Sequence, residues 1–187
     1  YEMQNRDWSS DVCSSDLIFK TQDDIFLNIL EIGRLINLDF YAKQLVDELK
    51  HKLRNIIDTS RSHNKIKVIN FDFTSYLMGE GTTFDLATRI LGIENMATNV
   101  LKLKGFKKIN IETLTRLNPD YLIVPVYDEM QDVHNFYVAV KKIPTFKNMR
   151  CIKDKKIIFV PYRLFSSLSH YFIDFIIYLH TQLFTHG

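Results

Sequence analysis

The run of apolar residues from Tyr121 to Val126 is uninterrupted, which is typical of a strand buried on both faces of a parallel sheet. Lys156 to Val160 repeats this pattern, and Ile66 to Phe73 is mostly strand-like. Stretches with helical periodicity precede, separate and follow these strands. This alternation predicts an α/β fold, a three-layer Rossmann-like lobe with a mainly parallel sheet.

Two helices are predicted before the first strand. The first runs from Asp23 to Asn37, and Asp39 is expected to cap a longer helix that ends near Ser60. The longer helix carries an apolar stripe with a 3.6-residue period and charged residues on its other face. This stripe consists of Ala42, Leu45, Val46, Leu49, Leu53, Ile56 and Ile57.

Capping signals predict four more helices between and after the strands. The first is capped by Thr82 or Thr83 and closed by Gly92, and the second is a short helix from Asn110 to Leu117. The third runs from Asp128 to about Lys142 and is broken by Pro144. The fourth is an apolar helix from Ser169 to Phe184.

Three loops are expected to hold the ligand site. Open α/β sheets bind ligands at the loops that follow the carboxyl ends of their strands. The predicted loops of this kind are Thr74 to Gly81, Tyr127 to Met130 and Pro161 to Ser169. Because each follows a parallel strand, we expect all three to meet at one edge of the sheet.

The first 17 residues are polar and show neither helical nor strand periodicity. They resemble a sequencing adapter translated in one reading frame, so we predict that they are foreign to the protein; a native disordered N-terminus is the alternative. The expected division is residues 1–17 as this foreign segment, 18–62 as a helical segment and 63–187 as the α/β lobe.

The overall charge and the cysteines exclude some classes. A formal net charge of +2 argues against a nucleic-acid-binding protein. Without residues 1–17, Cys151 remains alone, so no intramolecular disulfide is expected. The apolar run from Tyr171 to Leu179 contains Asp174 and is too short to span a bilayer.

Four segments in order carry a family resemblance. They are LEIGRLINLDFYAKQLVDEL (residues 30–49), GTTFDLATRILGIENMA (81–97), INIETLTRLNPDYLIV (109–124) and IPTFKNMRCIKDKKIIFVP (143–161). Together they resemble the inter-lobe helix and the C-terminal lobe of substrate-binding proteins of ABC importers, in the class that carries iron-siderophore chelates, haem or cobalamin. The last segment lacks the Ala-Val of the family pattern, and the N-terminal lobe is missing.

The resemblance implies a transport component without enzymatic activity or a resident cofactor. Its ligand would be a ferric chelate, haem or cobalamin, bound between two lobes, and its partners would be the permease subunits of the importer. It implies a location in the periplasm or on the extracellular face of the cell membrane, with the signal sequence and any membrane anchor upstream of this fragment. Without the other lobe, the apolar stripe is expected to be partly uncovered, with some of Leu45, Leu49, Leu53 and Ile56 exposed.

Glu112 is the predicted docking residue. It lies in the first turn of the helix capped by Asn110, at the position where the resemblance places a carboxylate that pairs with arginines of the permease. The alternative is an acidic residue that only complements the helix dipole.

Five loop residues are predicted to contact the ligand. Tyr76 and Met78 suit a large planar or apolar ligand. Tyr127 would stack on the ligand or, by the resemblance, bind ferric iron as a phenolate. Arg163, beside Tyr162, would pair with a carboxylate of the chelate. We expect the three tyrosines and Arg163 to converge, with ordinary packing or solvation as the alternative for each.

Other chemistries find little support in the sequence. The six histidines form neither an H-x-H nor an H-E-x-x-H pattern, which disfavours a bare zinc or manganese site, and no Gly-x-Ser-x-Gly elbow is present. A Rossmann-like or chelatase-like enzyme domain is the main alternative function, and a scaffold or adhesion module on the same fold is a third.

Overall fold

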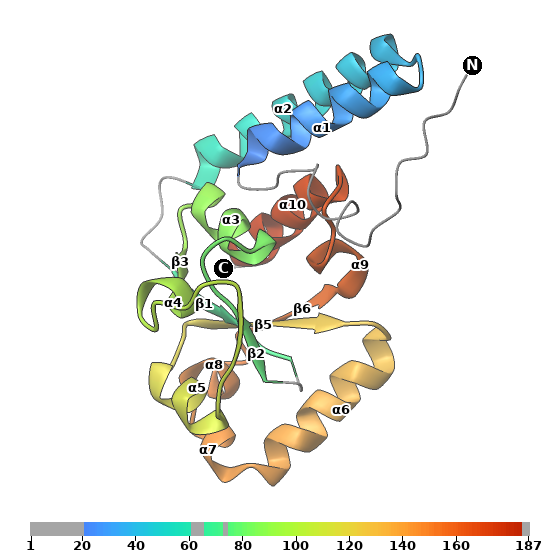
Figure 1. Cartoon of the computed structure of the whole chain (residues 1–187). Coiled ribbons are helices and arrows are strands. Elements are labelled where there is room, and N and C mark those ends of the chain that lie inside the picture. Colours follow the sequence, from blue (N-terminus) through green and yellow to red (C-terminus); the bar gives the residue numbers. More distant parts are fainter. Residues whose placement is uncertain (1–20, 61–65, 73–74, 185–187) are drawn as a thin grey trace, which may run out of the picture.

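The computed structural model describes residues 21–60, 66–72 and 75–184. Within these ranges, four parallel strands form the central sheet in the order β3-β1-β5-β6 (Figure 1). The predicted foreign segment 1–17 lies outside the described residues. The predicted α/β fold with a mainly parallel sheet is confirmed. The strands of this sheet are β1 (Lys67–Asn70), β3 (Glu94–Asn95), β5 (Tyr121–Val126) and β6 (Ile157–Pro161).

The central strands are apolar throughout because both of their faces are covered. In β5, Leu122 and Val124 belong to one core cluster, and Ile123 between them belongs to the other. In β1, Val68 belongs to one of these clusters and Ile69 to the other, and both are fully buried. Successive side chains of a strand point to opposite faces, so an uninterrupted apolar run supplies two cores at once.

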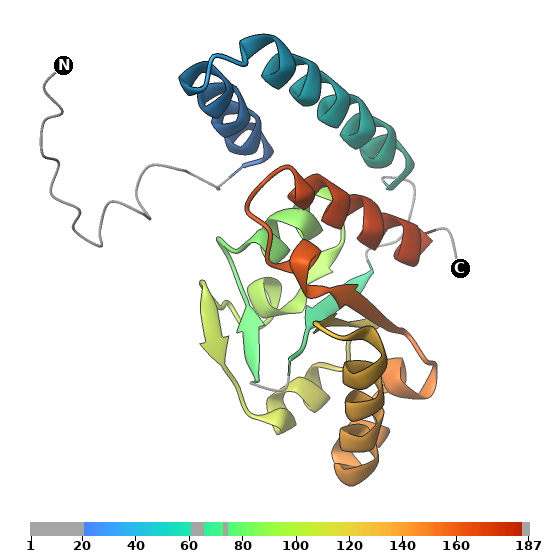
Figure 2. The same ribbon diagram turned by 90° about the vertical axis from the view of Figure 1, so that its right-hand side faces the viewer.

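Helices cover both faces of the sheet and give the predicted three layers (Figures 1 and 2). One core cluster joins the sheet to α3 (Thr83–Ile90) and α10 (Tyr171–Phe184). The other joins it to helices on the opposite face. Those helices are α4 (Met96–Asn99), α5 (Ile111–Leu117), α6 (Glu129–Lys142), α7 (Pro144–Lys147) and α8 (Arg150–Lys153).

The predicted caps at Thr82, Asn110 and Asp128 are present, whereas Asp39, expected to cap the longer N-terminal helix, is the first residue within that helix. Thr82 caps α3 and Asn110 caps α5, each by accepting a hydrogen bond from a backbone N–H in the first turn. Asp128 caps α6 in the same way, with 3.0 Å between its Oδ1 and the backbone nitrogen of Gln131. Gly92 follows α3 with a φ of +68°, in the left-handed region that glycine tolerates. Local signals therefore determined where these helices begin and end.

The first two helices, α1 (Gln22–Leu35) and α2 (Asp39–Ser60), form a hairpin that lies across α10 (Figures 1 and 2). Thr21 and Asp24 form a reciprocal capping box at the start of α1. Gly33 allows the two helices to approach, because a Cβ at this position would lie 2.3 Å from the Cβ of Ala42. The helical segment predicted before the lobe is therefore a pair of packed helices.

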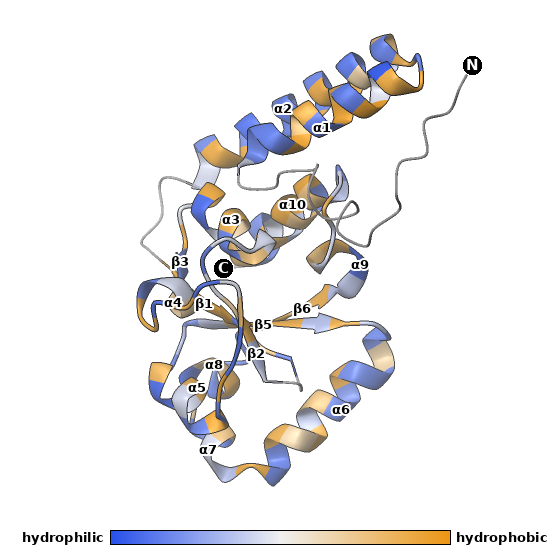
Figure 3. Cartoon of the chain, in the orientation of Figure 1, coloured by the Kyte–Doolittle hydropathy of each residue, from blue (hydrophilic) through white to orange (hydrophobic). Residues whose placement is uncertain are grey.

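The α2 stripe is covered more completely than expected, because Leu45 and Ile56 are half-buried and none of the four named residues is fully exposed. Leu49 and Leu53 are each only 3% exposed, because α1 and α10 pack against α2. Large exposed apolar side chains gather around the turn between α1 and α2. These are Leu35, Ile36, Leu38, Phe40 and Tyr41. Figure 3 colours the ribbon of these two helices by the hydropathy of each residue.

Three predicted irregular segments contain regular structure. The loop predicted from Thr74 to Gly81 holds β2 (Tyr76–Met78), which pairs in antiparallel fashion with β4 (Phe106–Lys108). The predicted loop after β6 holds the short helix α9 (Tyr162–Phe165), and Pro144 begins α7 after ending α6. These elements have three or four residues, which is too short for a hydrophobic period to appear in the sequence.

A buried polar network connects α3 to the segment after β3 and to β2. Asp85 is 1% exposed, and its carboxylate accepts hydrogen bonds from the Thr98 hydroxyl at 2.5 Å and the Asn95 amide at 3.4 Å. The same Asn95 amide donates to the Met78 backbone oxygen at 2.9 Å. Arg89 forms an ion pair with Asp85 at 3.1 Å from a side chain that is 58% exposed.

We predict that Asp85→Ala lowers the free energy of unfolding by about 3 kcal/mol, because it leaves the half-buried Thr98 hydroxyl without its acceptor and removes one acceptor of the buried Asn95 amide. Arg89→Ala, the matched control, should cost about 1 kcal/mol or less, because its guanidinium is mostly in water and the Asp85 carboxylate keeps its hydrogen bonds from Thr98 and Asn95. Urea unfolding followed by circular dichroism measures both losses. Equal losses in the two variants would contradict the importance of these hydrogen bonds.

Candidate ligand cavity

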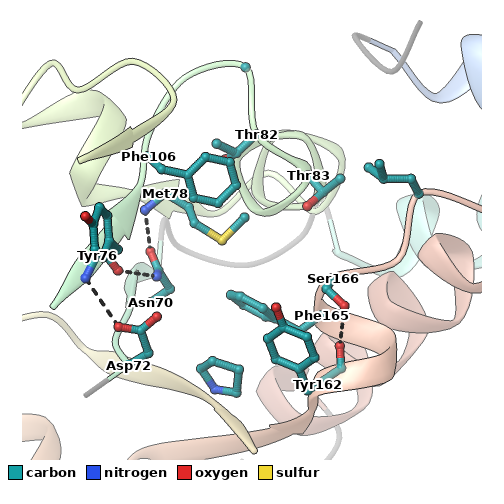
Figure 4. Close-up of a pocket in the computed structure, with 13 residues that line it drawn as sticks. Asn70, Asp72, Tyr76, Met78, Thr82, Thr83, Phe106, Tyr162, Phe165 and Ser166 are labelled. Carbon is teal, nitrogen blue, oxygen red and sulfur yellow. Dashed lines mark hydrogen bonds between the residues drawn. The ribbon is translucent and has the colours of Figure 1, made fainter. Parts of the chain in front are cut away.

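A cavity of about 310 Å³ lies at the carboxyl-terminal edge of the sheet (Figure 4). The ends of β1 and β5 border it through Asn70 and Pro125. One wall comes from β2 and β4, and the opposite wall comes from α9 and the residues that follow it. The N-terminus of α3 contributes Thr82 and Thr83. This is the edge at which the three predicted loops were expected to meet.

The first wall is the paired strands β2 and β4. Tyr76, Met78 and Phe106 line the cavity, with Met78 directly opposite Phe106 in the register. Leu77 between the two lining residues of β2 is fully buried in the core on the other side. The alternation of the strand therefore directs an aromatic ring and a thioether into the cavity and anchors the wall by Leu77.

Asn70 holds this wall in place from the end of β1. Its Oδ1 accepts a hydrogen bond from the Met78 backbone nitrogen at 2.8 Å, and its Nδ2 donates to the Tyr76 backbone oxygen at 3.1 Å. Asp72 accepts a further hydrogen bond from the Tyr76 nitrogen at 3.3 Å. Side chains thus satisfy backbone groups of β2 that no strand of the main sheet pairs with.

The second wall is α9 and the turn after it. Tyr162, Phe165 and Ser166 face the cavity across from β2 and β4 (Figure 4). The ring of Phe165 packs against Phe84 of α3 and Phe175 of α10, with centroid distances of 5.9 and 5.6 Å. This wall is therefore fixed by the core that α3 and α10 share.

Tyr127 extends the second wall outward. Its ring stacks on Tyr162 with 4.0 Å between centroids and 22° between planes, although 78% of Tyr127 is exposed. Hydrogen bonding with the Tyr162 side chain, and then partial desolvation and nearby negative charge, raise the pKa of Tyr127 to about 12. Its phenol is therefore protonated at neutral pH, and binding ferric iron as a phenolate would first require loss of this proton.

The predicted convergence of three tyrosines and Arg163 is correct for the tyrosines and wrong for Arg163. Tyr76 and Tyr162 line the cavity, and Tyr127 stacks on Tyr162. Arg163 instead borders a separate hollow with Asp174 of α10. The reason is the short helix α9, which turns successive side chains by about 100° and so directs Arg163 away from its neighbour.

Phe106, Phe165 and Asn70 were not singled out from the sequence. Phe165 stands three residues after Tyr162, so a helical reading of this segment would have placed both on one face. Phe106 and Asn70 carry no comparable signal. Phe106 reaches the cavity by pairing with β2, a segment distant along the chain, and Asn70 reaches it through side-chain hydrogen bonds to the same strand.

Glu112 is exposed in the first turn of α5, as predicted. It follows Lys108, the register partner of Tyr76, by four residues, so α5 begins close to the β2–β4 wall. Its role in docking stays a prediction.

Two further features concern membrane-spanning helices and metal-binding groups. Across residues 21–60, 66–72 and 75–184, no helix combines the length and apolar character that a membrane crossing requires. Within the same ranges, no three His, Cys, Asp or Glu side chains gather as a group that could hold a metal ion. Burial raises the pKa of the Cys151 thiol to about 11, so this cysteine is a protonated core residue at neutral pH.

The sequence matches the family model described as periplasmic binding protein over residues 4–164. The chain belongs to the periplasmic binding protein family. Members of this family are non-enzymatic components of transport systems, which disfavours the alternative of an enzyme domain. The match begins inside the segment interpreted as foreign, and that interpretation stays a prediction.

Solved structures of this family share the fold. A possible iron-binding (periplasmic solute-binding) protein from Staphylococcus epidermidis is 24% identical, with a TM-score of 0.74 over 89% of this chain and 64% of its own. An ABC-type Fe3+-hydroxamate transport system protein from Saccharomonospora viridis is 16% identical, with a TM-score of 0.75 over 88% of this chain and 56% of its own.

The periplasmic heme-binding protein RhuT from Roseiflexus sp. RS-1 is 16% identical, with a TM-score of 0.72 over 87% of this chain and 64% of its own. The chain thus spans less than two thirds of the length of these three structures. A comparison with curated proteins finds no match.

We predict that Tyr127 titrates near pH 12 and that Tyr162→Phe lowers its pKa toward the ordinary value of 10, because the variant removes the main hydrogen-bonding partner. Since the folded-state pKa is the higher one, stability from the pair is complete below about pH 10 and is lost as pH rises through 12. Carbon-13 NMR of Tyr Cζ resolves this titration. Tyr171→Phe is the control, and an unchanged Tyr127 titration in Tyr162→Phe would contradict the pairing.

Proposed function

We propose that this chain is the C-terminal lobe and inter-lobe helix of the substrate-binding protein of an ABC importer that carries an iron chelate, haem or cobalamin. The observation that carries the proposal is the cavity at the carboxyl ends of β1 and β5, with aromatic walls on both sides. The protein would work in the periplasm or on the outer face of the cell membrane, with permease subunits as partners.

The lining of the cavity favours a large ligand with apolar surface. Phe106 and Met78 face Tyr162 and Phe165 across the opening, so a planar or apolar group between them would be covered on both sides. The polar groups nearby are partly occupied, since both ends of the Asn70 amide bind the backbone of β2. Such walls suit a chelate better than a hydrated ion.

The size of the cavity supports a half-site. About 310 Å³ is at the lower end of the range for ligand pockets, which is about 300 to 1,000 Å³. A second lobe would close the cavity over these two walls, in line with the shorter length of this chain relative to the solved structures. The 22 residues of α2 extend about 33 Å, enough to reach between two lobes.

The exposed apolar turn between α1 and α2 also favours a missing lobe. Leu35 and Phe40 are 68% and 74% exposed at the end of the hairpin. Exposed apolar groups of this size are usual where another part of a protein packs. The hairpin would therefore connect this lobe to the one that precedes it.

A nuclear magnetic resonance titration of the 22.1 kDa chain tests the ligand. The probes are gallium(III) protoporphyrin IX, a gallium(III) hydroxamate complex, cyanocobalamin and molybdate, since diamagnetic gallium preserves the signals that iron would broaden. We expect saturable shifts at Met78, Phe106 and Tyr162 with at least one of the three chelates.

Phe106→Ala should weaken that binding about tenfold, through lost stacking and apolar contact. Phe40→Ala is the matched control, because Phe40 is similarly exposed and lies on the hairpin. No saturable shift with any chelate, shifts with molybdate alone, or equal effects of the two variants would refute the proposed function.

Glu112 is proposed as the docking carboxylate of this lobe. In the complete protein, Glu112→Ala should reduce uptake about fivefold and leave ligand affinity unchanged, because an exposed rim charge acts on association with the partner. Glu129→Ala is the control, since Glu129 is also exposed in the first turn of a helix. Lost ligand affinity in Glu112→Ala, or equal loss of uptake in the control, would refute this role.

A further inference from the structure

The β2–β4 ribbon places a lysine beside the aromatic wall. In its register, Met78 lies opposite Phe106 and Tyr76 lies opposite Lys108. Residues directly opposite each other in an antiparallel pair share a face. Since Tyr76, Met78 and Phe106 line the cavity, Lys108 belongs to the same face of the ribbon and lies next to the lining residues.

The other face of the ribbon confirms this assignment. Leu77 is fully buried in the core beneath the ribbon, and its register partner is Lys107. Lys107 and Lys108 thus carry the same charge at adjacent positions of β4, are both exposed, and belong to opposite faces. Of these two lysines, only Lys108 lies on the cavity side of the ribbon.

The charge of this segment is positive and mostly uncompensated along the chain. Four lysines stand between Glu94 and Glu112, with no acidic residue among them. Lys104 forms an exposed ion pair with Glu80 at 3.7 Å. Among the described residues, Lys108 has no ion pair within the usual distance. Its ammonium group is therefore available to a ligand at the cavity mouth.

We propose that Lys108 recognises a negatively charged group of the ligand, so that the cavity takes an anionic chelate with carboxylates at its periphery. The inference rests on the proposed function and specifies the class of chelate. The apolar centre of the ligand would pack on Met78 and Phe106, and a peripheral carboxylate would reach the Lys108 ammonium. Pairing with a carboxylate of the ligand, which the sequence suggested for Arg163, would thus be the role of Lys108 on β4.

Asp72 is the acidic residue in the cavity lining, and it accepts a hydrogen bond from the backbone of Tyr76. Because Lys108 is the register partner of Tyr76, its alternative role is to support this wall alone. The two roles differ in their consequence for neutral ligands. A residue that only supports the wall affects all ligands alike, whereas one that binds a carboxylate affects anionic ligands alone.

The test compares Lys108→Gln with Lys107→Gln in the 187-residue chain. Gallium(III) protoporphyrin IX and gallium(III) citrate are the anionic probes, and cyanocobalamin and a neutral gallium(III) hydroxamate are the neutral ones. Dissociation constants come from NMR titrations at low and high salt. We expect Lys108→Gln to weaken anionic binding about fivefold at low salt, and less at high salt, while Lys107→Gln and neutral binding change little.

The outcomes separate this inference from the proposed function. Chelate binding that Lys108→Gln and Lys107→Gln affect equally, or that Lys108→Gln weakens for neutral and anionic probes alike, overturns the role of Lys108 and leaves the transport function standing. A wild-type preference for the neutral probes does the same. If none of the four chelates binds, the proposed function fails and this inference fails with it.

Discussion

The side-chain amides of Asn70 and Asn95 hold β2 by its backbone, and the cavity depends on this attachment. Both residues are 2% exposed, and together they satisfy the nitrogen and oxygen of Met78 and the oxygen of Tyr76. Unpaired backbone groups in a buried position are costly, so these amides substitute for a neighbouring strand. A three-residue strand outside the main sheet thereby becomes a fixed wall.

The two walls of the cavity are attached to the core in different ways. The β2–β4 wall relies on hydrogen bonds from Asn70 and Asn95 and on Leu77 beneath it. The α9 wall relies on aromatic packing of Phe165 against α3 and α10. Polar networks set direction and apolar packing supplies most of the stability. Under the proposed function, these two walls are the part of the binding surface that this lobe contributes.

The candidate site could be located from the sequence more reliably than its members could be identified. The edge of the sheet followed from parallel strands, and Tyr76, Met78 and Tyr162 do line the cavity there. Arg163 was misplaced because a four-residue helix has too few turns to leave a period. Phe106 was missed because its place depends on pairing with β2, more than 25 residues earlier in the chain. The burial of Leu49 and Leu53 in the α2 stripe was not foreseen, because α10, at the other end of the sequence, helps to cover it.

The sequence by itself determined the α/β class, the buried strand β5 and the boundaries of the capped helices. These properties depend on interactions between residues that are close along the chain, such as the Asn110 cap, or on the hydrophobic pattern of one element. Tertiary structure decided which side chains share the cavity, that β2 and β4 pair, and that Lys108 stands on the cavity side of the ribbon. Such contacts join segments whose separation along the chain leaves no periodic signal, so only folding brings their residues together.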